Sequence, residues 1–417
     1  MTAEDRIGTA SPGVAVRPGA EIRPVPVAGG RIADIEVLRA IAIIFVLIHH
    51  ARGNLITWPT PVFDRLYSYL QFWPGVDLFF AISGFVIARS LVPALRRSEN
   101  RTAFIKTTIA FWIRRAWRLL PSAWLWLALI LIASAASGET GLFGSFRTNF
   151  EATIAAVLDV ANFRLASCFM QYPCGSSFVY WSLSLEEQFY ILLPIVILLA
   201  GRRLTVSIGI FVVVQFFIPR IAPILQMLRT DALLLGVLLA IWSSDATYRL
   251  CEPLVLKRSG LARWAVLIML LAGIAALGSD DLHIVQFRYG MIALLSAVLV
   301  MIASYDQDYL WRDSQVKRVF IWIGSRSYGL YLMHVPLYYV TREIWYRIDG
   351  RLPSSRIDDL GILATAAALL LLLSEINFRV IEDPLRARGA RIARRFSERP
   401  LHHSIAGITR TTDLLVK

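Results

Sequence analysis

The sequence predicts an all-α protein, a polytopic membrane bundle of about ten transmembrane helices. The first observation behind this prediction is composition: of 417 residues, 56% are hydrophobic and only 18% are charged, whereas soluble domains are about 25% charged. The second is a mean hydropathy of +0.58. The third is a series of apolar runs that approach the roughly 20 residues a helix needs to cross a bilayer.

Ten such runs follow one another along the chain, separated by loops that carry most of the charges. Each run predicts one helix, because a helix satisfies its backbone hydrogen bonds internally in lipid. With ten spans, both termini lie on the same side of the membrane. The predicted spans are 35–50, 72–92, 119–136, 178–199, 204–219, 230–243, 262–278, 288–304, 327–345 and 359–378.

Basic residues predict the orientation of the bundle. The net charge is +13, but Lys and Arg cluster between the spans rather than along one soluble surface, so nucleic acid is not an expected partner. Loops on the N-terminal side of the membrane hold about 30 of the 43 basic residues, and the opposite loops about 11. This positive-inside excess predicts that both termini are cytoplasmic.

Three segments are predicted along the chain. Residues 1–33 contain Pro, Gly, Ala, Val and scattered Arg without a hydrophobic run, which indicates a disordered cytoplasmic tail rather than a cleavable signal peptide. Residues 34–386 form the transmembrane domain. Residues 387–417 form a basic cytoplasmic tail, either a solvated end, which we favour, or an amphipathic helix on anionic lipid.

The three cysteines are too few for a disulfide scaffold or a zinc site, and no bound metal is expected. Cys168 and Cys174 lie six residues apart in the loop 137–177, which the charge count places outside the cytoplasm. A disulfide and two free thiols both remain open for this pair. Cys251 falls in a cytoplasmic loop and is expected to be reduced.

A basic residue and a histidine share one face of the first span. Arg39 and His50 are eleven residues apart, about three helical turns, which separates them by roughly 16 Å along the helix. Ionisable side chains inside a membrane span are costly and usually functional. An arginine near one surface can hold a phosphate while a histidine deeper in the membrane does proton chemistry. The pair indicates an enzyme that passes a group across the bilayer.

Other spans bring further polar residues to the predicted depth of His50. Acids and histidines that faced lipid would cost several kcal/mol each, so we expect them to face a common interior. Satisfied polar contacts between helices are the competing interpretation for the acids and the second histidine. This outer layer consists of His50, Asp77, Glu186 and His334, with Trp181 and Ser182 beside them.

A basic and aromatic stretch marks the cytoplasmic side of the third span. It contains Arg114, Arg115 and Arg118 among aromatic residues, and interleaved guanidiniums and indoles suit a ligand with phosphates and a stackable base. An interfacial anchor is the alternative. Taken with His50, the stretch predicts a cofactor-binding site for acyl-coenzyme A, whose phosphopantetheine arm would span the roughly 15 Å between the two layers.

Six motifs in order resemble those of acyltransferase family 3, the membrane O-acyltransferases that include bacterial O-acetyltransferases of lipopolysaccharide and exopolysaccharide. The resemblance covers nearly all of residues 34–386. The motifs are Arg39-x10-His50, the stretch from Gly75 through Asp77 to Phe85, Arg115-x-x-Arg118, the stretch from Trp181 through Glu186 to Tyr190, the stretch from Ser327 through His334 to Pro336, and Glu382-Asp-Pro384.

The resemblance implies that His50 is the essential catalytic group and that Arg39 is needed with it. It implies acyl-coenzyme A, usually acetyl-coenzyme A, as co-substrate, a hydroxyl of a polysaccharide, lipopolysaccharide or glycoside as acceptor, and a bacterial cytoplasmic membrane. His49 departs from the family pattern and makes a histidine doublet. Some relatives carry an extra extracytoplasmic hydrolase-like domain, which this chain lacks, so we expect the membrane domain to meet the acceptor itself.

Two chemistries are open for His50: a general base that removes the proton of the attacking hydroxyl, and a nucleophile that forms an acyl-histidine. Asp77 or Glu186 would orient the imidazole or hold the sugar. Trp181, Ser182 and His334 are the predicted substrate contacts. A transporter or flippase of a lipid-linked sugar is the main competing function, but transport does not need the arginine-histidine pair. The sequence contains no nucleophile elbow, P-loop or zinc spacing.

Overall fold

A computed structural model describes residues 31–398, apart from 139, 283 and 352–358. The described residues form helices and no strand, so the predicted all-α fold is confirmed. Most of the predicted N-terminal tail, and the final residues 399–417, lie outside the described residues.

Each of the ten predicted spans is helical. Within the described chain, six helical runs are long and apolar enough to cross a membrane, and three of them, Tyr180–Phe217, Pro223–Trp242 and Leu360–Glu398, combine more than one helix. This supports a polytopic membrane protein by length and composition. The helices at the predicted spans are α1 Ala33–Asn54, α3 Gly75–Arg96, α4 Arg101–Ala136, α7 Tyr180–Ala200, α8 Leu204–Phe217, α10 Asp231–Trp242, α13 Gly260–Leu277, α14 Arg288–Ser304, α16 Ser327–Asp349 and α17 Asp359–Asn377.

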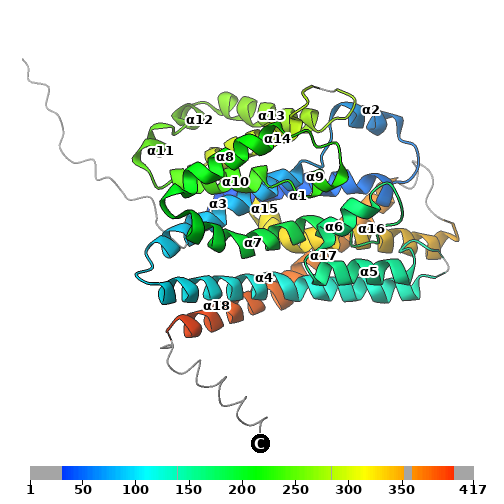
Figure 1. Cartoon of the computed structure of the whole chain (residues 1–417). Helices are drawn as coiled ribbons and strands as arrows, with labels where there is room; N and C mark the ends of the chain where they lie inside the picture. The colour runs from blue at the N-terminus through cyan, green and yellow to red at the C-terminus, as the bar shows by residue number, and fades with distance from the viewer. Residues whose placement is uncertain (1–30, 139, 283, 352–358, 399–417) are drawn as a thin grey trace, which may run out of the picture. The chain divides into compact units, whose positions relative to one another are not determined.

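These helices run along one common direction, and shorter helices lie at the two ends of the bundle (Figure 1). One end, here called the basic end, is where α4 begins and α18 lies. The other, here called the loop end, carries α2, α5 and α6. The shorter helices are α2 Pro61–Tyr69, α5 Phe146–Val157, α6 Ala161–Cys168, α9 Pro223–Met227, α11 Ala246–Leu250, α12 Leu254–Arg258, α15 Gln315–Ser325 and α18 Asp383–Glu398.

Helices α3 and α10 pack with their backbones almost in contact. A side chain at Gly84 would collide with the carbonyl of Leu233, and one at Gly236 would collide with the carbonyl of Ala81. Small residues at such crossings allow the close approach that drives helix packing in membranes. The contact fixes the start of α10 against the middle of α3.

Helix α1 lies at the centre of the bundle and packs against α3, α14, α15 and α16. Its first turn is fixed by α15: the Lys317 ammonium lies 2.7 Å from the Asp34 carboxylate, and Gly324 allows the backbone of Glu36 to approach closely. Asp34 and Lys317 are both almost fully buried. This central position directs Arg39 and His50 toward the interior.

The C-terminal segment differs from the predicted boundary at residue 386. A π-helical turn at Phe378–Glu382 leads directly into α18, which packs along α4. Gly389 and Ala393 make this possible, because Gly389 lies against Trp117 and Ala393 is fully buried. The first part of the predicted tail is therefore a packed helix rather than a solvated end.

Candidate active site

Two histidines from distant parts of the chain meet inside the bundle. The Nδ1 atom of His50 on α1 lies 3.0 Å from the Nε2 atom of His334 on α16. His334 is fully buried, and its Nδ1 lies 2.7 Å from the carbonyl oxygen of Tyr331. His50 therefore faces the interior of the bundle, as the sequence predicted, and has a specific imidazole partner.

The backbone of α1 around His50 is held by side chains from three places. The hydroxyl of Tyr338 donates to the carbonyl of Leu47 at 2.9 Å, and the hydroxyl of Tyr67 donates to the carbonyl of Ile48 at 3.0 Å. The amide of Asn54 donates to the carbonyl of His50 itself at 2.8 Å. These bonds limit rotation and translation of the helix end that carries the imidazole.

The long loop after α4 folds over this region. Phe178 places its ring edge-on to the His50 ring, with 5.4 Å between the ring centroids. This lies within the range of about 4.5–7 Å typical of aromatic pairs. Cys168 and Cys174 form a disulfide, which decides the question the sequence left open. Asn149 ties the loop together by donating to the carbonyl of Phe143 and accepting from the amide of Ser176.

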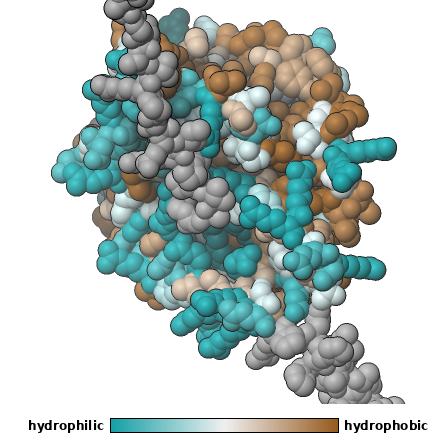
Figure 2. Space-filling view, turned by 90° about the vertical axis from the view of Figure 1, so that its left-hand side faces the viewer, coloured by the Kyte–Doolittle hydropathy of each residue, from teal (hydrophilic) through white to brown (hydrophobic). Residues whose placement is uncertain are grey.

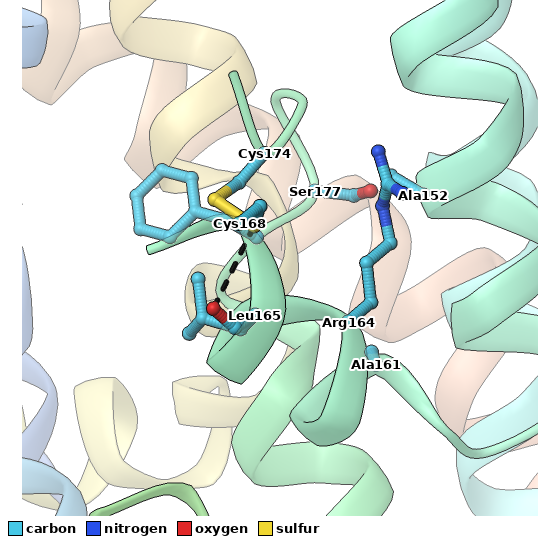
Figure 3. A pocket seen from close by; sticks show the side chains of 8 residues that line it. Ala152, Ala161, Arg164, Leu165, Cys168, Cys174 and Ser177 are labelled. Carbon is cyan, nitrogen blue, oxygen red and sulfur yellow. Dashed lines mark hydrogen bonds between the residues drawn. A yellow bond between two sulfur atoms is a disulfide. The ribbon is translucent and has the colours of Figure 1, made fainter. Parts of the chain in front are cut away.

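A small pocket lies beneath the disulfide, and Phe178 is part of its wall. Figure 3 shows the guanidinium of Arg164 and the hydroxyl of Ser177 on the same side of this pocket, across from the sulfur atoms. The Nε atom of Arg164 and the Oγ atom of Ser177 are buried without a hydrogen-bond partner. The pocket is thus polar on one wall and adjoins the aromatic contact of His50.

His49 lies in a different environment from its neighbour. Its ring stacks on Tyr67 at 6.3 Å between centroids, and its Nδ1 is buried without a hydrogen-bond partner. Among the described residues, His50 alone of the doublet is hydrogen-bonded through its ring. The structure thus separates two histidines that the sequence distinguished only by spacing.

Asp77 does not orient the histidines. Both of its carboxylate oxygens are occupied by the guanidinium of Arg229, at 2.8 and 3.0 Å, and both side chains are almost fully buried. The sequence-based role of Asp77 beside the imidazole is therefore corrected to a buried ion pair between α3 and the segment before α10. The acid is held away because a bidentate arginine satisfies it completely.

Trp181 and Ser182 lie near this ion pair and near α16. The Arg229 guanidinium sits over the Trp181 ring at 4.8 Å from its centroid, a cation–π arrangement. The hydroxyls of Ser182 and Tyr331 are 2.6 Å apart. Since Tyr331 also supplies the carbonyl that bonds His334, the start of α7 is connected to the histidine pair through one residue.

Glu186 lies deeper along α7 than the sequence suggested. Its carboxylate is hydrogen-bonded by the hydroxyls of Ser83 and Tyr190, and it interacts electrostatically with Arg39 and Arg115. The predicted contact of Glu186 with the histidine layer is corrected accordingly. It is one helical turn further from the helix start than Ser182, which brings it toward the arginines.

Three arginines gather in the interior on the basic side of Glu186. Arg39, Arg115 and Arg118 lie within electrostatic range of one another. Arg39 pairs with Glu36 at 2.9 Å, whereas in the described part of the chain no carboxylate lies within ion-pair distance of Arg115 or Arg118. We call these three residues the arginine layer. Guanidiniums inside a bundle that have no direct ion-pair partner, such as those of Arg115 and Arg118, are suited to bind an anion.

Arg114 does not belong to this layer. Its side chain is exposed, whereas Arg115 and Arg118 are partly buried, because one residue along a helix turns the side chain by about 100°. The structure therefore does not bring Arg114 together with Arg115 and Arg118, as the predicted donor site had it. Figure 2, which looks onto the basic end, shows hydrophilic side chains gathered over its left and lower parts and apolar ones at upper right.

Arg229 is a residue of the site that the sequence analysis did not consider. Arg229 precedes α10 and holds Asp77 while lying over Trp73, Trp181 and Tyr289. The available signal was an arginine bordering an apolar span, which is a costly position without a partner. His334 was found, but its contact with His50 was not, because no sequence pattern specifies which two helices meet.

The interior polar residues of this helical bundle form two layers, the arginine layer and a layer with the two imidazoles of His50 and His334. Comparison with known proteins gives the class: residues 32–374 match the family described as an acyltransferase domain. The chain therefore belongs to acyltransferase family 3. No solved structure matches the chain.

Similar curated proteins carry O-acetyltransferase names. The O-acetyltransferase OatA of Staphylococcus aureus (strain NCTC 8325 / PS 47) is 28% identical over 378 residues, which is 85% of this chain and 57% of the relative. The peptidoglycan O-acetyltransferase OatA of Listeria monocytogenes serovar 1/2a is 26% identical over 388 residues, 86% of this chain and 56% of the relative. The chain thus spans a little over half the length of these relatives.

Proposed function

We propose that this protein transfers an acyl group, by default acetyl, from acyl-coenzyme A to a hydroxyl of a cell-surface polysaccharide. The observation that carries the proposal is the combination, in one family-3 bundle, of an arginine layer and an interior histidine pair. In this proposal the basic end faces the cytoplasm, where the donor is made, and the loop end faces outward in a bacterial cytoplasmic membrane.

The donor would enter at the basic end. Arg115 and Arg118 supply charges without an ion-pair partner within the described residues, and Arg39 lies beside them. Phosphates accept charge-assisted hydrogen bonds from guanidinium groups. Because Arg39 and His50 are on one helix, the eleven-residue step sets them roughly 16 Å apart. An extended phosphopantetheine arm of that length would bring the thioester to the histidine layer.

His50 would serve as general base in this proposal. Its imidazole takes the proton of the acceptor hydroxyl while the oxygen attacks the thioester carbonyl carbon. The carbon–sulfur bond then breaks, and the coenzyme A thiolate takes the proton from the imidazolium, which leaves an ester and free coenzyme A. General-base catalysis of this kind contributes about 10²–10⁴-fold to a rate.

The acceptor would approach from the loop end. Support comes from the folded loop that places Phe178 against His50, and from the name of the Listeria relative, which specifies peptidoglycan. Hydroxyls of a surface glycan are the acceptor class we propose. Mass spectrometry of surface glycans before and after deletion of the gene identifies the acceptor as the glycan that loses an ester.

The function is tested with the protein reconstituted in vesicles and supplied with acetyl-coenzyme A and a surface glycan fraction. We expect release of free coenzyme A together with ester formation. His50→Ala should reduce both to background without lowering the melting temperature, whereas His49→Ala should retain substantial activity. Movement of a lipid-linked sugar without coenzyme A release would indicate a flippase instead, and full activity of His50→Ala would refute the catalytic assignment.

A further inference from the structure

The contacts of His334 determine where the protons of both imidazoles lie. The carbonyl oxygen of Tyr331 can only accept a hydrogen bond, and it lies 2.7 Å from His334 Nδ1. That nitrogen therefore carries the proton. A neutral imidazole has one donor and one acceptor nitrogen, so Nε2 of His334 has the free electron pair.

The same reasoning continues to His50. Its Nδ1 lies 3.0 Å from the accepting Nε2 of His334, so Nδ1 of His50 must donate and carries the proton. Its Nε2 then has the free electron pair. In the described part of the chain, no other side chain is hydrogen-bonded to the His50 ring. The two hydrogen bonds leave one nitrogen with a free electron pair, His50 Nε2. His50 is half-buried, whereas His334 is fully buried.

We propose that His334 is a positioning residue, which holds His50 in the tautomer whose Nε2 atom is the base. The inference rests on the proposed function of His50 and replaces the sequence-based idea that His334 contacts the acceptor. Both nitrogens of His334 are occupied, and its side chain is fully buried. It therefore has no free polar atom for a sugar.

The histidine doublet supports this assignment. His49 is adjacent to His50 in sequence, and the centroids of the two rings are 4.9 Å apart. The Nδ1 atom of His49, however, is buried without a hydrogen-bond partner among the described residues. No hydrogen bond to His49 Nδ1 from the described residues therefore fixes the tautomer of His49. An imidazole held in one tautomer needs no reorganisation before it takes a proton, whereas a free one does. We call the two hydrogen bonds from Tyr331 through His334 to His50 the relay, although no proton moves along it. The relay explains why His50, of the two histidines, is suited to be the base.

The relay also acts after proton transfer. When Nε2 of His50 accepts the hydroxyl proton, the ring becomes a cation with Nδ1 still bonded to a neutral acceptor. A charge in the membrane interior is costly unless it is hydrogen-bonded. The Nε2 atom of His334 supplies that bond, and the proton leaves from His50 Nε2 to the coenzyme A thiolate. His334 gains and loses no proton in the cycle.

Steady-state kinetics of reconstituted His334 variants test the relay. His334→Leu removes the acceptor and should lower kcat by about 10²–10⁴-fold, while the KM for acetyl-coenzyme A stays within about threefold because the arginine layer is untouched. His334→Gln keeps a side-chain oxygen that can accept a hydrogen bond from His50. Its kcat should be at least about tenfold higher than that of His334→Leu. The matched control is Thr341→Val, which removes a fully buried hydroxyl of the same helix that donates to the carbonyl of Leu337 and should keep wild-type kcat.

A spectroscopic measurement separates the relay from a structural role. Solid-state NMR of the ¹⁵N-histidine-labelled protein, assigned with the His50→Ala variant, should show His50 protonated at Nδ1 and not at Nε2. His334→Leu with wild-type kcat, or His50 protonated at Nε2 in the wild-type protein, would overturn the relay while leaving the proposed function intact. Activity of His50→Ala would instead overturn the proposed function. If His334→Leu does not fold, the wild-type spectrum alone decides.

Discussion

Neighbouring arginines of α4 differ in where their side chains lie, and this difference yields a test of the donor site. Arg115→Ala or Arg118→Ala should raise the KM for acetyl-coenzyme A by about 10- to 100-fold, since a hydrogen bond to a charged group contributes about 1.5–3 kcal/mol. Arg114→Ala should leave KM within about twofold, because that side chain is exposed. Coenzyme A release at varied donor concentration measures this. Equal effects of all three changes would contradict the donor site.

Individual residues also show how far sequence reasoning reached. Arg39, His50 and His334 could be found because ionisable residues in apolar spans are rare and costly. The roles of Asp77 and Glu186 could not be read, because a carboxylate's partner comes from another helix. Asp77 is satisfied by Arg229, 152 residues later in the chain, and hydropathy contains no information about that pairing.

At the scale of elements, α15 fixes the first turn of α1. Burial alone would lower the pKa of Lys317, but hydrogen bonds to Asp308 and Asp34 raise its pKa overall, so the ammonium is charged at neutral pH. Lys317→Met would leave the Asp34 carboxylate buried without a cation. Such losses cost about 3–5 kcal/mol, so we expect a clearly lower melting temperature in detergent.

The control for this change is Lys257→Met, which removes an exposed lysine bonded to Gln307 and should change stability by less than about 0.5 kcal/mol. A Lys317→Met protein that melts like the wild type would show that α15 does not hold α1 in place.

Hydropathy predicts the apolar parts of the helices, but it does not predict their polar parts. The predicted third span began at residue 119, whereas α4 begins at Arg101. The basic residues of its first half lower hydropathy without weakening the helix, since Arg and Lys are good helix formers. Helices α5 and α6 lie in a loop that the sequence marked only by its low basic content. The helix α18 was missed as a packed element because its close approach to α4 occurs at Gly389, which lies against Trp117 and, having no side chain, adds no apolar signal to the sequence.

At the scale of the whole molecule, the two layers occupy different depths on one central helix. Helix α1 carries Arg39 among the interior arginines and His50 beside His334. Because four other helices pack against α1, the separation of the layers is set by a rigid element. In the proposed function, a donor that binds at the basic end can therefore present its thioester nearer the loop end without any movement of the polypeptide across the membrane.

The most direct measurement is a cryo-EM structure of the reconstituted protein with a non-reactive acetyl-coenzyme A analogue. The account predicts the phosphates against Arg115 and Arg118, the pantetheine arm along α1, and the acetyl carbon next to the Nε2 atom of His50. An analogue bound with its acetyl group at the basic end, or with its phosphates at the loop end, would contradict it.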